Sequence, residues 1–235
     1  MPNAQPPLTA ISSMATRQVL AALAQQWAGQ GGVPLEITSV GGVDAARRVQ
    51  AGEAFDLVFL ASDALGELEA AGHLLAGSVR PLMRSGVAVA VREGAAQPDL
   101  RSEASLRAAV LAASSVGYST GPSGTALLAL FERWGVRAAL ADRLVQAQPG
   151  VPVAQLVAQG QVALGFQQLS ELLHVPGITI AGPLPEAVQI ETVFSGALAS
   201  TCADSARRQA ATAALAFMAS PAALPALTAQ GMRPA

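Results

Sequence analysis

Short apolar runs alternate with amphipathic stretches from the start of the chain. Residues 8–11, 35–40 and 55–60 form apolar runs of strand length, and the stretch after each run repeats its apolar positions at spacings of three and four. Gly52 stands where the second helix would stop, and Asp63 where the third would be capped. The pattern predicts strands and helices in strict alternation.

The same alternation restarts in the second part of the chain. Further strands are predicted at residues 86–91, 115–119, 162–166, 177–183 and 188–198. Helices are predicted from Ser102 or Ser105 to Ala113, at 125–134 and 153–159, after a cap at Ser170, at 206–219 after a cap at Asp204 or Ser205, and at 222–230. Strands that are apolar on both faces are typical of parallel sheets covered by helices. We therefore predict an α/β fold with two lobes, each a mostly parallel sheet flanked by helices.

The amino-acid composition limits the classes of partner that the protein could bind. Arginine supplies all 14 basic residues of the 235, against 16 acidic ones, so the net charge is -2 and there is no basic field for nucleic acid. With 51% hydrophobic and 13% charged residues, the chain is too apolar to stay unfolded. Arginine, glutamine, glycine or proline interrupts each apolar run before the roughly 18 residues of a membrane span. We expect no nucleic-acid partner and no direct membrane insertion.

The cellular location is not fixed by the sequence. Residues 1–7 lack the charged and apolar regions of a secretory signal. A periplasmic location, for a chain whose signal has been removed, and a cytoplasmic one are both open. The single cysteine, Cys202, forms no internal disulfide and is expected to be a buried bystander.

Small, hydroxylated and amide-bearing residues gather where predicted strands pass into helices, which is where doubly wound sheets bind ligands. Unpaired N–H groups at several helix starts would hold an anion without any lysine. The candidate ligand-binding residues in these loops are Ser12, Ser13, Gly41, Gly42, Gly121, Ser123, Gly124, Gln167, Gln168 and Ser170.

Each serine has a simpler alternative role as a helix cap, worth roughly 1 kcal/mol. For one serine the cap is the better interpretation, but the recurrence of such loops favours binding. Tyr118, just before a loop, and Arg84, between the two blocks, complete the candidate ligand site. An arginine can hold a carboxylate through two hydrogen bonds. A core position for Tyr118 and a solvated one for Arg84 are the alternatives.

Catalytic motifs are scarce. Neither His73 nor His174 has another histidine or a cysteine near it at metal-ligand spacing. We expect no metal and no cofactor. Asp56, inside an otherwise apolar strand, is expected to be a hydrogen-bonded structural acid.

The chain carries a series of motifs in a fixed order. They are Ala10-Ile11-Ser12-Ser13-Met14, Ser39-Val40-Gly41-Gly42, Phe55-Asp56-Leu57-Val58-Phe59-Leu60-Ala61-Ser62-Asp63, Val162-Ala163-Leu164-Gly165-Phe166 and Ala216-Phe217-Met218-Ala219-Ser220-Pro221. The series resembles type 2 periplasmic solute-binding proteins, in particular the molybdate-binding-protein family of ABC importers. Residues 118–124 and 165–172 resemble a divergent branch that includes aconitate isomerase-like proteins.

The resemblance implies two lobes joined by two crossover strands, with the ligand in the cleft between them. Lobe I would comprise residues 1–82 and 189–235, and lobe II residues 83–188. The family binds oxyanions through serine hydroxyls and backbone amides, a role that falls here on Ser12 and Ser13. Val43 replaces a further serine of molybdate binders, and glutamines stand near an expected tyrosine. Amides and arginine suit an organic carboxylate.

Two functions follow. The leading hypothesis is a monomeric solute-binding protein that holds a small anion, an organic carboxylate or an oxyanion, and serves an ABC permease. The alternative is an aconitate isomerase-like enzyme that shifts a proton on a small tricarboxylate. Its base could be Tyr118, Glu171 or His174, and the sequence leaves the catalytic residue unassigned.

Overall fold

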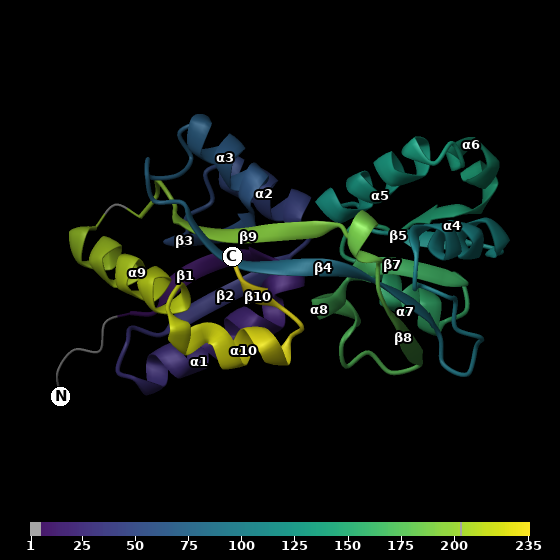
Figure 1. Cartoon of the computed structure of the whole chain (residues 1–235). Coiled ribbons are helices and arrows are strands. Elements are labelled where there is room, and N and C mark those ends of the chain that lie inside the picture. Colours follow the sequence, from purple (N-terminus) through teal and green to yellow (C-terminus); the bar gives the residue numbers. More distant parts are fainter. Residues whose placement is uncertain (1–5, 203) are drawn as a thin grey trace. The chain divides into compact units, whose positions relative to one another are not determined.

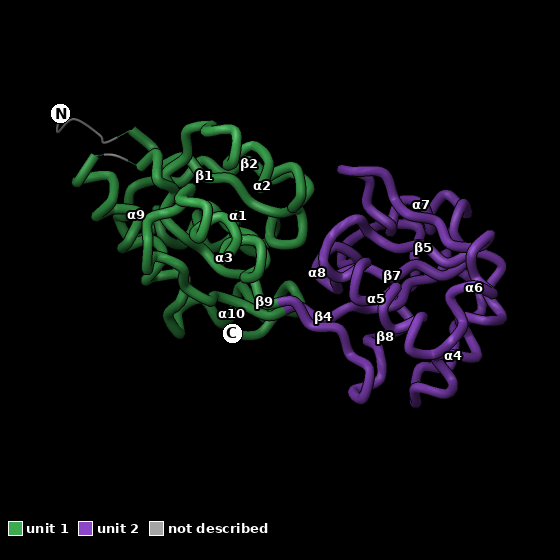
Figure 2. The backbone as a smooth tube through the Cα atoms, turned by 90° about the horizontal axis from the view of Figure 1, so that it is seen from above, with its two compact units in different colours: residues 1–84, 193–235 green, residues 85–192 purple. Residues whose placement is uncertain are grey.

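The computed structural model describes residues 6–202 and 204–235. Residues 1–5, part of the segment considered above for a secretory signal, lie outside the described residues. The chain divides into unit 1, residues 1–84 and 193–235, and unit 2, residues 85–192 (Figure 2). It leaves unit 1 within strand β4 (Arg80–Arg92) and re-enters it within β9 (Glu191–Leu198). The expected lobe ranges, 1–82 with 189–235 and 83–188, stay a prediction.

The sheet of unit 1 is built on three parallel strands. Their order is β2 (Leu35–Val40), β1 (Leu8–Ser13) and β3 (Leu57–Ala61), with β9 antiparallel to β3 and β10 (Arg233–Pro234) antiparallel to the unit 1 part of β4. Strand β1 passes into the 3-10 turn η1 (Met14–Thr16) and α1 (Arg17–Gly29), β2 into α2 (Gly42–Gln50), and β3 into α3 (Ser62–Ala70). The three helix starts therefore share one edge of the sheet.

Helices cover both faces of this sheet (Figure 1). Helices α1, α9 (Ser205–Met218) and α10 (Leu224–Ala229) pack on one face, and α2 and α3 pack on the other. Along β3, Leu57 and Phe59 enter the first core while Val58 and Leu60 enter the second. This two-sided burial explains the continuous apolar run in the sequence.

Unit 2 repeats the layered arrangement. Strand β7 (Leu164–Gln168) pairs parallel with β5 (Val116–Tyr118) and antiparallel with β4; β6 (Leu144–Gln146) pairs parallel with β5, and β8 (Ile178–Pro183) antiparallel with β4. Helices α4 (Glu103–Ala112), α5 (Pro122–Arg133) and α6 (Arg137–Leu140) pack on one face, and α7 (Val153–Ala158) and α8 (Leu169–Leu172) on the other (Figure 1). The predicted α/β class is confirmed in each unit.

Two predicted caps are confirmed and two are wrong. Asp204 accepts hydrogen bonds at the start of α9, and Ser102 forms a capping box with Ser105 at the start of α4. Asp63 lies in the first turn of α3, where its charge complements the helix dipole without capping it. Ser170 lies inside α8 rather than before it, because the chain turns helical directly after β7.

Four strands differ from the sequence-based prediction, among them β10, which was not predicted. Strand β6 was not predicted, since a run of three residues gives no clear period. Strand β4 begins at Arg80, six residues before its expected start at 86. Strand β9 begins at Glu191, after the 3-10 turn η3 (Glu186–Val188), where a strand was expected from residue 188.

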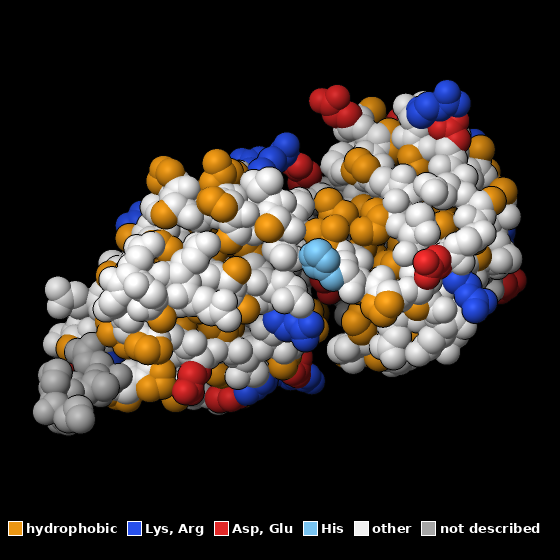
Figure 3. All heavy atoms as spheres, turned by 90° about the horizontal axis from the view of Figure 1, so that it is seen from below, with side chains coloured by type: hydrophobic (Ala, Val, Ile, Leu, Met, Phe, Trp, Pro, Cys, Tyr) orange, Lys and Arg blue, Asp and Glu red, His pale blue; other side chains and the backbone are white. Residues whose placement is uncertain are grey.

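The face of the molecule shown in Figure 3 carries little concentrated charge. On the face shown in Figure 3, acidic and basic side chains are scattered in small groups over a largely neutral surface. Within the described ranges, no single helix has the length and apolar character to cross a membrane; Ser205–Met218 and Pro221–Ala229 meet that test only as a pair, bent by 64°.

Candidate functional site

The predicted polar site residues are buried. Side chains with hydrogen-bonding groups and less than 9% exposure include Ser12, Ser13, Ser123, Gln167, Gln168 and Ser170. Burying polar groups is costly unless they find partners, in the protein or in a ligand. Their partners therefore decide what each unit can bind.

In unit 1, the hydroxyl of Ser12 lies at the carboxyl end of β1. Ser12 is in register with Ser39 on β2, and their Oγ atoms are 2.8 Å apart. The Ser12 hydroxyl also lies 3.3 Å from the carbonyl oxygen of Ser13. Ser39 belongs to the motif Ser39-Val40-Gly41-Gly42 but was not predicted as a site residue. The available signal was the alternation along β2, which places Ser39 on the same face as Leu35 and Ile37.

The backbone beside Ser13 is open to close approach. A Cβ atom placed on Gly42 would lie 3.7 Å from the Ser13 Cβ, so the second and first strand exits are neighbours. Ser13 precedes η1 without capping it, and its hydroxyl lies 3.4 Å from the Thr16 hydroxyl. The alternative role of Ser13 as an ordinary cap is not observed.

Helices α2 and α3 begin without a side-chain cap. Their N-cap residues are Gly41 and Ala61, which have no side chain able to accept a hydrogen bond. The first N–H groups of a helix have no partner inside the helix and carry the positive end of its dipole. Two uncapped helix starts beside Ser12 and Ser13 form a setting that favours an anion.

In unit 2, three parallel strands end at one edge. Register pairs Tyr118 of β5 with Gln146 of β6, and Gly117 with Gly165 of β7. The segments that follow, residues 119–124, 147–153 and 169–172, therefore lie at the same edge of the sheet. The segment 147–153 was missed from the sequence because β6 was missed.

The loop after β5 packs tightly against α5. The Oγ atoms of Ser119 and Ser123 are 3.2 Å apart. A Cβ atom on Gly124 would lie 1.9 Å from the Ser119 carbonyl oxygen, so only glycine fits at this point of the helix. Gly121, the N-cap of α5, provides no side-chain cap, and a Cβ there would meet nothing closer than 4.0 Å.

Gln167 links α7 to α8. Its Oε1 accepts the backbone N–H of Ala154, in the first turn of α7, at 3.0 Å, and its Nε2 donates to Oε1 of Glu171 at 3.0 Å. Ala154 lies on the α7 face of β7, in the same small core as Leu172 of α8. The side chain of Gln167 is thus fixed at both of its polar atoms.

Glu171 is the most perturbed carboxyl group of the described chain. Burial raises its pKa to about 7, and the hydrogen bond from Gln167 opposes that rise only in part. None of the described ion pairs includes Glu171. The sequence suggested this residue as one of three bases but gave no means of choosing it, because its burial depends on the packing of α7 and α8.

Two buried oxygens in unit 2 have no hydrogen-bond partner among the described residues. They are Oε1 of Gln168 and Oγ of Ser85. The Gln168 amide donates to Oγ1 of Thr192 at 2.7 Å. Gln168 is in register with Val87 on β4, two residues from Ser85, so both oxygens lie near the carboxyl end of β7. Ser85 was not predicted, since a lone serine in a strand carries no signal.

The remaining candidates are more loosely placed. Tyr118 is half-buried at the end of β5 and packs against the unit 2 core, and Arg84 is exposed and in register with Arg233. His174 is exposed and has a positive φ of 64°.

Asp56 has the structural role that the sequence predicted. Burial opposes its charge, but hydrogen bonds from Arg207 and from the Thr9 backbone outweigh that effect, so the pKa of Asp56 is lowered. Cys202 is buried nearby, and burial raises the pKa of its thiol to about 11. The two residues tie β1 and β3 to α9, away from the strand exits.

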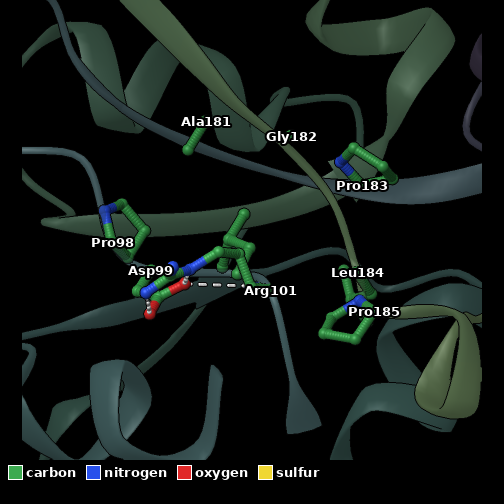
Figure 4. Close-up of a pocket in the computed structure, with 9 residues that line it drawn as sticks. Pro98, Asp99, Arg101, Ala181, Gly182, Pro183, Leu184 and Pro185 are labelled. Carbon is green, nitrogen blue, oxygen red and sulfur yellow. Dashed lines mark hydrogen bonds and ion pairs between the residues drawn. The ribbon is translucent and has the colours of Figure 1, made fainter. Parts of the chain in front are cut away.

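Each unit has an open hollow among its described residues. One of about 450 Å³ in unit 2 is lined by Pro98–Arg101 and Ala181–Pro185, with Asp99 and Arg101 bonded to each other on one side of it (Figure 4). One of about 350 Å³ in unit 1 runs between α1 and β2 and includes Ser39. Of the described residues, no three or more histidine, cysteine or acidic side chains group as a metal site would require.

Known proteins resemble this chain over nearly its whole length. An aconitate isomerase from Pseudomonas sp. is 36% identical over 97% of this chain and 87% of its own. The fold matches the periplasmic molybdate-binding protein of Azotobacter vinelandii (TM-score 0.79, 21% identity, 96% and 98% of the two chains). It also matches the sulfate-binding protein SubI of Mycobacterium tuberculosis (TM-score 0.77, 18% identity, 98% and 87%). The predicted two-lobed solute-binding fold is confirmed, and residues 8–233 match a family model: the chain belongs to the bacterial extracellular solute-binding proteins.

Proposed function

We propose that the protein binds a small organic carboxylate through the strand exits of its two units. The observation that carries this proposal is the set of buried hydroxyl and amide groups beside helix starts that lack side-chain caps. Such groups stabilise an anion by directed hydrogen bonds without a full positive charge. The proposed ligand-binding residues are those predicted above except Gln167, whose polar atoms are bonded within the protein, with Ser39 and Ser85 added.

The class of anion is inferred from the kinds of hydrogen-bonding group at the strand exits. A tetrahedral oxyanion suits a shell of hydroxyls and backbone N–H groups, whereas carboxylates also use side-chain amides and arginine. Gln168 contributes an amide whose oxygen is still unpaired within the described chain. The aconitate isomerase relative supports a polycarboxylate.

The first candidate activity is transport. Membership in an extracellular solute-binding family supports a role as the substrate-binding component of an ABC importer, in the periplasm, with a permease as partner. The protein would then bind its ligand and release it unchanged. As part of this proposal, we expect one ligand to contact both units. Variants in either unit would then weaken the binding of that ligand.

The second candidate activity is isomerisation of an aconitate-type tricarboxylate. Glu171 favours it, because a carboxyl group with a pKa of about 7 is suited to accept and return a proton at neutral pH. The relative with 36% identity over 97% of the chain supports the same reaction.

Calorimetry and proton NMR test both candidates on the same sample. Titration with cis-aconitate, trans-aconitate, citrate, molybdate and sulfate measures binding. Incubation with cis-aconitate in deuterated water measures interconversion and deuterium uptake. Binding of a carboxylate without turnover supports the carrier, and turnover with deuterium uptake supports the isomerase. A preference for molybdate or sulfate, or no binding at all, contradicts the proposal.

A further inference from the structure

Glu171 is an acid without a cation. In the described chain its one hydrogen-bond donor is the Gln167 amide, and it takes part in no ion pair. A structural carboxylate in a folded protein is normally neutralised by arginine or lysine, as Asp56 is by Arg207. Holding Glu171 here without a cation costs folding free energy, and packing alone does not explain why the residue is there. Titratable groups in such unfavourable surroundings are common at functional sites.

Its orientation is set by a side chain that cannot turn freely. Gln167 is 2% exposed and has its oxygen bonded to the Ala154 N–H and its nitrogen to Glu171. This arrangement fixes Oε1 of the Glu171 carboxyl group, whereas Oε2 accepts no hydrogen bond from the described residues. Gln167 is therefore a positioning residue, bound to the protein rather than to a ligand.

Glu171 lies near the edge of the sheet at which doubly wound folds bind their ligands. It lies in α8, which begins directly after the carboxyl end of β7. The neighbouring parallel strand β5 ends in Tyr118 and leads to the Ser119–Gly124 segment. A ligand held by the serine and backbone groups of that segment is bound at the sheet edge from which α8 starts.

We infer that Glu171 is the catalytic residue that takes a proton from an unsaturated tricarboxylate and returns it to another carbon of the same molecule. This inference rests on the isomerase candidate of the proposed function. The ionised Glu171 forms an O–H bond as a C–H bond of the substrate methylene breaks. The released electron pair spreads over the adjacent double bond and carboxylate.

The second half-step restores the enzyme. The O–H bond of Glu171 breaks as a C–H bond forms at the far end of the three-carbon unit, so the double bond moves by one position. In aconitate this transposition regenerates the same constitution and changes only the cis or trans geometry. No electron or atom is gained or lost, so the step needs neither an oxidant nor a cofactor.

The test compares Glu171→Gln with the wild type on cis-aconitate. The variant keeps the shape of the side chain and its contact with Gln167 but cannot accept a proton. We expect its interconversion rate to fall by at least about 100-fold, the lower range for a lost acid–base group. Binding of the saturated analogue tricarballylate, measured by calorimetry, should be retained. Glu171→Asp, with a shorter acid, should keep part of the rate.

The matched control is Glu132→Gln, which removes an exposed glutamate of α5 that is paired with Arg137. It should turn over at the wild-type rate. A Glu171→Gln protein with wild-type turnover overturns this inference and leaves the isomerase function standing. A wild-type protein that binds aconitate without interconverting it overturns both the isomerase function and the role of Glu171.

Discussion

Replacing Glu171 by glutamine should stabilise the protein at alkaline pH. Burial raises the pKa of this carboxyl from its ordinary 4.5 to about 7 in the folded state. The folded protein therefore holds a proton between these values that the unfolded chain has lost. The contribution of Glu171 to the free energy of unfolding is fully present below pH 4.5 and is lost as the pH rises through about 7. Glutamine does not ionise, so the variant does not share this loss.

The size of the effect follows from the shift. A rise from 4.5 to about 7 corresponds to at most about 3 kcal/mol of unfolding free energy, reached above pH 7. Because Glu171 is only partly covered, solvent reduces this value. The difference between Glu171→Gln and the wild type should thus be small at pH 4.5 and should reach roughly 2–3 kcal/mol at pH 8.

Urea unfolding at a series of pH values measures this difference. Trp27 lies in unit 1 and Trp134 in unit 2, so in a Trp27→Phe background the fluorescence reports the unit that contains Glu171. Glu132→Gln, at an exposed ion pair, is the control and should change little across the range. Parallel pH profiles for the wild type and Glu171→Gln would show that the carboxyl is not held in a desolvated environment and would refute the reasoning.

Three further predictions concern other parts of the structure. Gly124→Ala should destabilise unit 2 by about 1–3 kcal/mol in urea unfolding, because of the clash with the loop before α5, whereas Gly121→Ala should cost under about 1 kcal/mol. Arg207→Met should cost about 2–3 kcal/mol at pH 7 by leaving Asp56 buried without its cation, and the loss should shrink as acid protonates Asp56 at pH 3, measured in the same way. Ser12→Ala should weaken carboxylate binding about tenfold by calorimetry; unchanged affinity would remove Ser12 from the site.

Local signals in the sequence were enough for the architecture but not for the partners of each side chain. The apolar run at 55–60 predicted a strand covered on both faces, and Asp204 predicted a helix start, because both signals are local. The link from Gln167 to Ala154 joins residues 13 apart through the packing of α7 on β7, so no spacing rule predicts it. Sequence reasoning placed Gln167 toward a ligand, whereas the structure shows both of its polar atoms bonded within the protein.

The same carboxyl group has opposite consequences for the two candidate functions. An ionised Glu171 beside a bound polycarboxylate would repel it, and this cost disappears when the group is neutral, as its raised pKa allows near neutral pH. In a carrier, neutrality is all that is needed, so glutamine should serve as well as glutamate. In an isomerase the group must gain and lose its proton in every cycle, so glutamine keeps the binding and abolishes the reaction. The split between affinity and turnover at this one position therefore separates a carrier from an isomerase.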